Sequence, residues 1–198
     1  PVTMLYSRAI MPEAPALFFY CGGVYYLLRW HLENMNTFVW LSAVFTALAI
    51  TQKAPLVFVG ILILYVFIKK LKKDCLKSGL FYGYGLIALA IPAVYYFYAS
   101  SVATFKFVNG ITQKHILSSA IFSVFSQKGI KFFLSGIPEY FGPALTVFGI
   151  AGLLLSFSHE RRFIMVWAAA FLLEWMMVVA VIRLGYYLIF MAPVFAVL

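Results

Sequence analysis

The fold is decided by the stretch from Asn34 to Ile68, NMNTFVWLSAVFTALAITQKAPLVFVGILILYVFI. It contains two long apolar runs, and Lys53 is its only charged residue. A cation at the depth of a lipid bilayer costs roughly 2.5–3.5 kcal/mol, so it normally has an anionic partner or reaches water. The pattern therefore predicts two membrane helices, with Lys53 either in an ordinary loop between them or in a binding site.

Composition places the chain in a membrane. Of its 198 residues, 65% are hydrophobic and only 11% are charged, which leaves too little polar surface to cover a soluble domain of this size. A net charge of +9 would suit nucleic acid in a soluble protein. Here the basic residues lie between apolar runs, where lipid headgroups and anionic lipid substrates are nearer partners. We expect an integral membrane protein in a lipid bilayer, without a nucleic-acid partner.

Charge-free apolar intervals predict the helices, because a spanning helix needs about 20 predominantly apolar residues and shorter ones are tolerated when tilted. Such intervals lie at 14–28, 37–51, 54–68, 79–101, 140–157, 163–182 and 184–198. They predict an all-α fold, a polytopic transmembrane helical bundle of about seven spans. The short intervals are expected to extend into the interface or to pack as half-spans.

Basic residues predict the orientation of this bundle. They divide almost evenly, but the dense clusters at 69–73 and 159–162 lie in short loops, where the positive-inside rule is strongest. With those loops in the cytoplasm, Lys53 lies on the outer side and residues 102–139 form a long external loop. The apolar residues of 116–125 share one helical face, which predicts an amphipathic helix that lies in the interface or packs against the bundle.

The chain is expected to form a single, partial transmembrane domain over residues 1–198. It starts at Pro1 without an initiator Met or a signal peptide, so we expect an interior piece of a longer protein. No spacing typical of a metal site, a phosphate loop or a serine nucleophile is present. Residues 83–88 match a dinucleotide fingerprint formally but lie in an apolar run without a preceding strand, so helix packing is expected there. Gly79 and Gly83, four residues apart in the same run, likewise predict a helix contact.

Few ionisable side chains are placed for chemistry. Glu13 opens a span near Arg8, where it serves either as a helix cap or as an acid facing a polar cavity. Glu174 stands in an apolar run and is expected to be protonated or paired across helices. Arg183, followed by Tyr186 and Tyr187, suits either phosphate recognition or anchoring at the interface.

Four segments, in their order and spacing, resemble one family of membrane enzymes. They are MPEAPALFF at 11–19, TQKAP at 51–55, YFGP at 140–143 and RLGYYLIFMAP at 183–193. Together they are similar to the GT-C glycosyltransferases of the protein O-mannosyltransferase and aminoarabinose transferase superfamily (glycosyltransferase family 39-like). The second segment departs from that family's Thr-Lys-Gly-Pro break, since Gln52 is inserted and Ala54 replaces glycine.

The resemblance implies transfer of a sugar, with inversion, from a dolichyl- or undecaprenyl-phosphate carrier to an acceptor hydroxyl on a protein, lipid or glycan outside the cytoplasm. It implies that Lys53, Arg183 and Tyr187 bind the carrier phosphate. Glu13, with Arg8, would be the second external acid, which orients sugar, acceptor or a divalent cation; no cofactor is certain. His115 is a weaker candidate. The general base is expected upstream of Pro1, so this piece alone is expected to be inactive.

Two other classes remain open from the sequence. In a polytopic transporter or lipid flippase, Lys53, Glu174 and Arg183 would form a buried charge network along a substrate path. In a structural membrane subunit, each of these residues would serve only packing or anchoring. The enzyme hypothesis predicts that Glu13, Lys53 and Arg183 converge on one outward-facing cavity. A prokaryotic plasma membrane is favoured as the location, with the endoplasmic reticulum as the alternative.

Overall fold

The computed structural model describes residues 13–102, 125–155, 162–179 and 185–197, and every regular element in these ranges is helical. The all-α membrane class predicted from the sequence is confirmed. The described residues belong to two compact units, one within Pro12–Val102 and the other, for its described part, within Ala103–Leu198. Each unit is described by itself.

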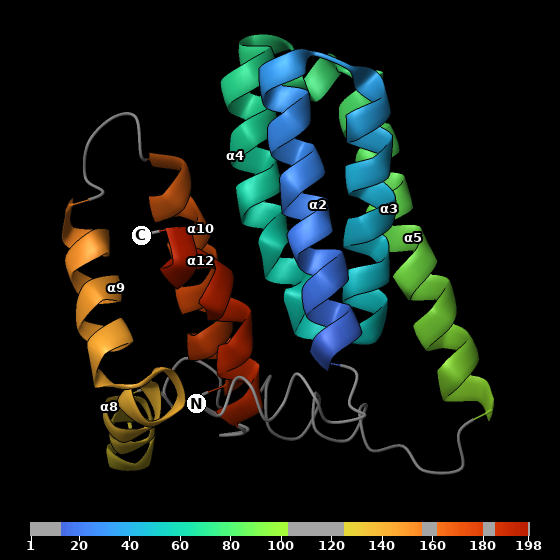
Figure 1. The fold of residues 1–198 in the computed structure, drawn as a ribbon. Helices are drawn as coiled ribbons and strands as arrows, with labels where there is room; N and C mark the ends of the chain where they lie inside the picture. Colours follow the sequence, from blue (N-terminus) through green and yellow to red (C-terminus); the bar gives the residue numbers. More distant parts are fainter. Residues whose placement is uncertain (1–12, 103–124, 156–161, 180–184, 198) are drawn as a thin grey trace. The chain divides into compact units, whose positions relative to one another are not determined.

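The first unit is an antiparallel group of helices. Its elements are α2 (Glu13–Glu33), α3 (Asn36–Gln52), the 3₁₀ helix η1 (Ala54–Val59), α4 (Gly60–Leu71), the 3₁₀ helix η2 (Lys72–Lys77) and α5 (Gly79–Val102). Helix α2 lies between α3 and α4, and α5 packs against α3 (Figure 1). The turn after α2 contains Asn34 with φ 61°, a left-handed conformation that asparagine tolerates at helix ends.

Helix lengths agree with a membrane location. In the described part of the chain, the helical stretches Ala54–Lys77, Gly79–Val102 and Arg162–Val179 are long and apolar enough to cross a membrane. Shorter apolar helices are Asn36–Gln52, Pro143–Gly152 and Tyr187–Ala196. Within the described residues, each of the seven apolar intervals therefore overlaps a helix or two consecutive helical segments, and three of these stretches are both long and apolar enough for a full span.

Glycines bring the helices of the first unit close together. A Cβ on Gly22 or Gly23 of α2 would collide with Phe45 or Thr46 of α3, and one on Gly83 of α5 would lie 2.6 Å from the Trp40 ring. Small residues at such contacts let helix backbones approach in membranes. The helix contact predicted at Gly79 and Gly83 is therefore found at Gly83, whereas Gly79 has open space around it.

A buried hydroxyl network links three helices of the same unit. The Tyr84 hydroxyl of α5 lies 3.0 Å from Ser42 Oγ and 2.8 Å from Thr46 Oγ1, both on α3. Ser42 in turn donates to the Gly23 carbonyl oxygen of α2 at 2.7 Å. Because buried hydroxyls need partners, this network specifies how α2, α3 and α5 align.

The second unit contains α8 (Gln127–Phe141), α9 (Pro143–Leu155), α10 (Arg162–Glu174), the π-helix η5 (Trp175–Val179), the 3₁₀ helix η6 (Gly185–Met191) and α12 (Ala192–Val197). Ser126 caps α8 by accepting a hydrogen bond from the Gly129 N–H at 3.1 Å. Helix α8 occupies part of the predicted external loop. Nearly all of the amphipathic helix predicted at 116–125 lies outside the described residues.

Candidate functional site

The site begins with the break between α3 and η1. Helix α3 ends at Gln52, and Lys53 is extended, with φ −144° and ψ 103°. Its N–H still donates to the Ala49 carbonyl oxygen at 2.9 Å, and its own carbonyl oxygen accepts from Leu56 N–H at 3.0 Å. Pro55 has no N–H to continue the helical ladder. The chain therefore turns here and presents the Lys53 side chain at the end of α3.

Tyr96 of α5 compensates for this break. In a continuous helix, the carbonyl oxygens of Ile50 and Thr51 would accept from residues 54 and 55. Instead, the Tyr96 hydroxyl lies 3.0 Å from the Ile50 oxygen and 3.2 Å from the Thr51 oxygen. Sequence reasoning missed this residue, since a tyrosine in an apolar run is not distinctive. The signal was present at Pro55, because a proline break in a membrane helix requires another donor for the freed carbonyls.

Lys53 forms an ion pair with Glu13, the first residue of α2. The distance from Lys53 Nζ to Glu13 Oε1 is 2.5 Å, and the side chains are 12% and 1% exposed. The second carboxylate oxygen of Glu13, Oε2, is buried and has no hydrogen-bond partner in the part of the chain that the structure describes. The anionic partner that Lys53 needed is thus 40 residues away in sequence, on the neighbouring helix.

This ion pair is isolated from the other charges of its unit. Between residues 13 and 102, all other charged side chains lie in 29–33 and 69–77. Those segments are at the other end of the unit, where α2 ends and α3 begins (Figure 1). The 17 residues of α3 separate the two ends by about 26 Å. Within residues 13–102, Glu13 and Lys53 therefore form a charge centre at the end of the unit opposite its other charges.

The family to which the chain belongs is shown by a match that covers the first unit. The family model for dolichyl-phosphate-mannose-protein mannosyltransferase matches residues 2–108, more than half of the chain. The chain belongs to this family. No curated protein and no solved structure gives a significant match.

Family membership confirms the resemblance to GT-C glycosyltransferases, and it supports a glycosyltransferase that uses a polyprenyl-phosphate sugar. The protein is an integral membrane protein, as its apolar helices indicate. The matched residues include Glu13, Lys53 and Tyr96 and cover the whole first unit, whereas the described helices of the second unit, from Gln127 onward, lie beyond the match. The first unit is therefore the part of the chain on which the family assignment rests.

The remaining predicted site residues are placed as follows. Arg8, His115 and Arg183 lie outside the described residues. Tyr187 is half-buried in η6 of the second unit. The structure thus brings Glu13 and Lys53 together, and the roles assigned to all six residues stay predictions. Among the described residues, no cluster of three His, Cys, Asp or Glu side chains is placed to hold a metal ion.

Glu174 is a buried acid of the second unit. Its side chain is 1% exposed, and Oε1 has no hydrogen-bond partner among the residues described. It stands where α10 changes into the π-helix η5. π-Helical turns often occur at functional sites, but the family match, which ends at residue 108, assigns Glu174 no function.

Proposed function

We propose that the protein transfers a sugar from a polyprenyl-phosphate carrier to an acceptor hydroxyl, and that Lys53 binds the phosphate of that carrier. The observation that carries this proposal is the buried ion pair between Glu13 and Lys53 at the helix break, within the residues matched by the family model. Helix packing alone does not require a largely buried lysine at this position. A lysine here can, however, bind the phosphate group of a lipid carrier.

Lys53 suits the phosphate for electrostatic reasons. The phosphate is the leaving group, and negative charge on its oxygens increases as the bond to the sugar breaks. A fixed cation in a region of low dielectric stabilises that charge more strongly than a cation in water. Lys53 is held by its extended backbone and by Glu13, so little reorganisation is needed. Arg183 and Tyr187 are proposed to complete the phosphate site.

Glu13 has two roles in this proposal. Its Oε1 holds the ammonium group of Lys53, and its buried Oε2, unpaired within the described residues, is placed to accept a hydrogen bond from a hydroxyl of the sugar or of the acceptor. A buried carboxylate oxygen without a donor is costly, and a bound substrate would supply the donor. Arg8 is proposed to act with Glu13 in orienting the substrate. As an alternative to a substrate hydroxyl, Glu13 would bind a divalent cation.

The finer features of the reaction are proposals that the family resemblance suggests. We propose mannose as the sugar, dolichyl or undecaprenyl phosphate as the carrier, and a protein hydroxyl as the acceptor, with a lipid or glycan as the alternative. The reaction inverts the anomeric carbon on the extracytoplasmic side of a multi-pass protein, in a prokaryotic plasma membrane in preference to the endoplasmic reticulum.

Carrier binding tests this proposal without requiring turnover. The purified chain in detergent micelles is titrated with dolichyl phosphate, and Kd is measured for the wild type, Lys53→Gln and Lys53→Arg. Losing a charge-assisted contact should weaken binding about 10- to 100-fold, and arginine should restore part of the affinity.

Lys128→Gln is the matched control, because Lys128 is an exposed cation of α8 in the second unit. It should bind the carrier like the wild type. Equal Kd values for Lys53→Gln, Lys128→Gln and the wild type would remove Lys53 from the phosphate site.

A further inference from the structure

The end of the first unit opposite Lys53 carries most of its charge. It is formed by the end of α2, the end of α4 and η2. Its basic residues are Arg29, Lys69, Lys70, Lys72, Lys73 and Lys77, and its acidic residues are Glu33 and Asp74. The excess of positive charge exceeds what local ion pairs can neutralise, so this end attracts anions.

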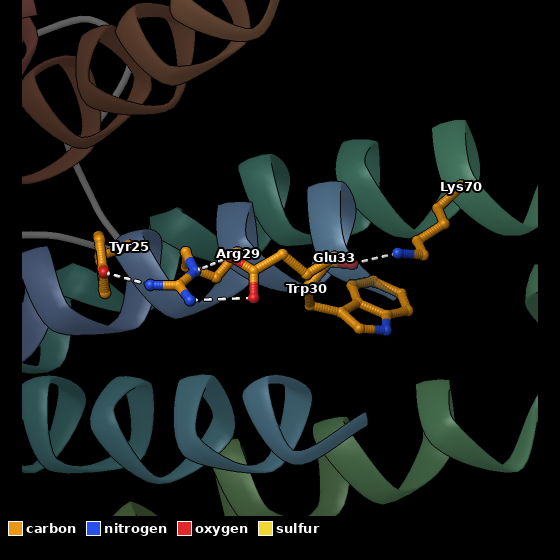
Figure 2. Close-up of polar contacts among 5 residues, drawn as sticks. All are labelled: Tyr25, Arg29, Trp30, Glu33 and Lys70. Carbon is orange, nitrogen blue, oxygen red and sulfur yellow. Dashed lines mark hydrogen bonds and ion pairs between the residues drawn. The ribbon is translucent and has the colours of Figure 1, made fainter. Parts of the chain in front are cut away.

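Two of these cations are engaged in contacts inside the first unit, Arg29 within α2 and Lys70 between α4 and α2. Arg29 donates to the Tyr25 hydroxyl at 2.8 Å and to Glu33 Oε2 at 2.9 Å. Lys70 of α4 donates to the carbonyl oxygens of Trp30 and His31, the latter at 3.2 Å, near the end of α2 (Figure 2). A lysine at a helix C-terminus satisfies the last carbonyls and complements the helix dipole. Arg29 and Lys70 are therefore structural.

Aromatic packing makes this end rigid. The Nζ atom of Lys70 lies 4.4 Å from the centre of the Trp30 ring. The same ring packs against Phe67 of α4 at a centroid distance of 4.6 Å. These contacts hold the end of α4 against α2, and they therefore fix the position at which η2 begins.

The 3₁₀ helix η2 presents three lysines beside an apolar side chain. Lys72, Lys73 and Lys77 are exposed, and Leu76 is 68% exposed, whereas Cys75 is buried and anchors the segment. Lysines with an exposed leucine at the end of a spanning helix suit the boundary between lipid headgroups and acyl chains, where the ammonium groups meet phosphate and the leucine enters the hydrocarbon.

We propose that η2 and the end of α4 form a binding surface for the headgroups of anionic phospholipids, with Lys72, Lys73 and Lys77 contacting their phosphates. Basic clusters directly beside a membrane helix are the usual means of recognising such lipids. This surface lies one length of α3 away from Lys53, so it is separate from the proposed carrier site and does not depend on it.

The test is a titration of the purified chain in zwitterionic detergent micelles with phosphatidylglycerol, phosphatidylcholine or inorganic phosphate, with thermal unfolding as the readout. Phosphatidylglycerol should raise the midpoint temperature of the wild type, because a ligand that binds the native state stabilises it. The variant Lys72→Gln/Lys73→Gln/Lys77→Gln should bind phosphatidylglycerol roughly 100-fold more weakly, about fivefold for each lysine. Replacement of the same three lysines by arginine should preserve binding, as should Lys128→Gln/Lys131→Gln in α8.

Several outcomes would overturn the proposal. These are an equal shift with phosphatidylcholine, an equal shift with inorganic phosphate alone, or full retention of the shift by the triple glutamine variant. A second measurement needs only the wild type, in case that variant fails to fold. Photoactivatable phosphatidylglycerol should crosslink preferentially to residues 69–77, and crosslinks spread evenly over the chain would contradict the assignment.

Discussion

The hydroxyl of Tyr96 donates to the carbonyl oxygen of Ile50 at 3.0 Å, across from α5 to the end of α3. This contact allows α3 to end at Gln52, directly before Lys53, because the broken helix would otherwise leave carbonyl groups without donors. The position of the proposed phosphate site therefore depends on a residue 43 positions further along the chain.

Removing this hydroxyl should destabilise the helix break. Tyr96→Phe keeps the ring and leaves the carbonyl oxygens of Ile50 and Thr51 without their donor, so we expect a loss of about 1 kcal/mol in the free energy of unfolding. Denaturant titration of the chain in mixed micelles measures this loss. Tyr95→Phe is the control, because Tyr95 is exposed and no hydrogen bond of its hydroxyl is seen within the described ranges. Equal effects of the two changes would contradict the role given to Tyr96.

Glu13 and Lys53 should be energetically coupled. Breaking a buried pair by removing one partner costs about 3–5 kcal/mol, whereas removing both charges costs less than the sum. We therefore expect Glu13→Gln and Lys53→Met each to destabilise the chain, and the double variant to be at least about 1 kcal/mol more stable than additivity predicts. The measurement is a double-mutant cycle of unfolding free energies. Strict additivity would show that the pair contributes nothing as a pair.

Two glycines of α5 should respond in opposite ways to the same substitution. Gly83→Ala places a Cβ 2.6 Å from the Trp40 ring, whereas Gly85→Ala meets open space. Overpacking should make Gly83→Ala less stable by about 1–3 kcal/mol. Gly85→Ala should be up to about 1 kcal/mol more stable, because alanine favours the helix. Thermal unfolding of both variants under the same conditions decides this, and a stabilised Gly83→Ala would mean that α3 and α5 are not in close contact.

Adjacent lysines at the end of α4 should differ in their effect on stability. Lys70 donates to the last carbonyls of α2, whereas exposed Lys69 lies 6.0 Å from the centre of the Tyr65 ring on its own helix. Lys70→Met should therefore lower the free energy of unfolding by about 1 kcal/mol, since a helix cap is lost. Lys69→Met should change it by less than about 0.5 kcal/mol. A larger effect at Lys69 would refute the capping role of Lys70.

Composition and local residue spacing were sufficient to predict the helices and the unusual position of Lys53. The apolar intervals predicted the helices, and the cost of a cation in lipid indicated that Lys53 needs a partner or water. Local spacing also explains why α2 continues to Glu33 instead of ending at Leu28: Arg29 and Glu33 are one helical turn apart and pair on the helix surface. The i, i+4 spacing of Arg29 and Glu33 would have extended the helix predicted at 14–28 to Glu33.

Contacts between distant segments could not be predicted in this way. Six acidic residues occur in the chain, and only the packing of α2 on α3 selects Glu13 as the partner of Lys53. Tyr84 and Tyr96 are alike by residue type, yet one joins a hydroxyl network and the other replaces missing backbone donors. The difference between them arises from which turn of α3 each faces, and a single sequence does not contain that register.

The length of α3 has a consequence for the lipid around it. Its 17 residues span about 26 Å, whereas the hydrocarbon core of a typical bilayer is about 30 Å thick. A bilayer thins next to a helix that is too short for it, at a modest cost in free energy for each ångström. Where α3 faces lipid, the two leaflets are thus expected to lie closer together, which brings a phosphate at headgroup height nearer to Lys53.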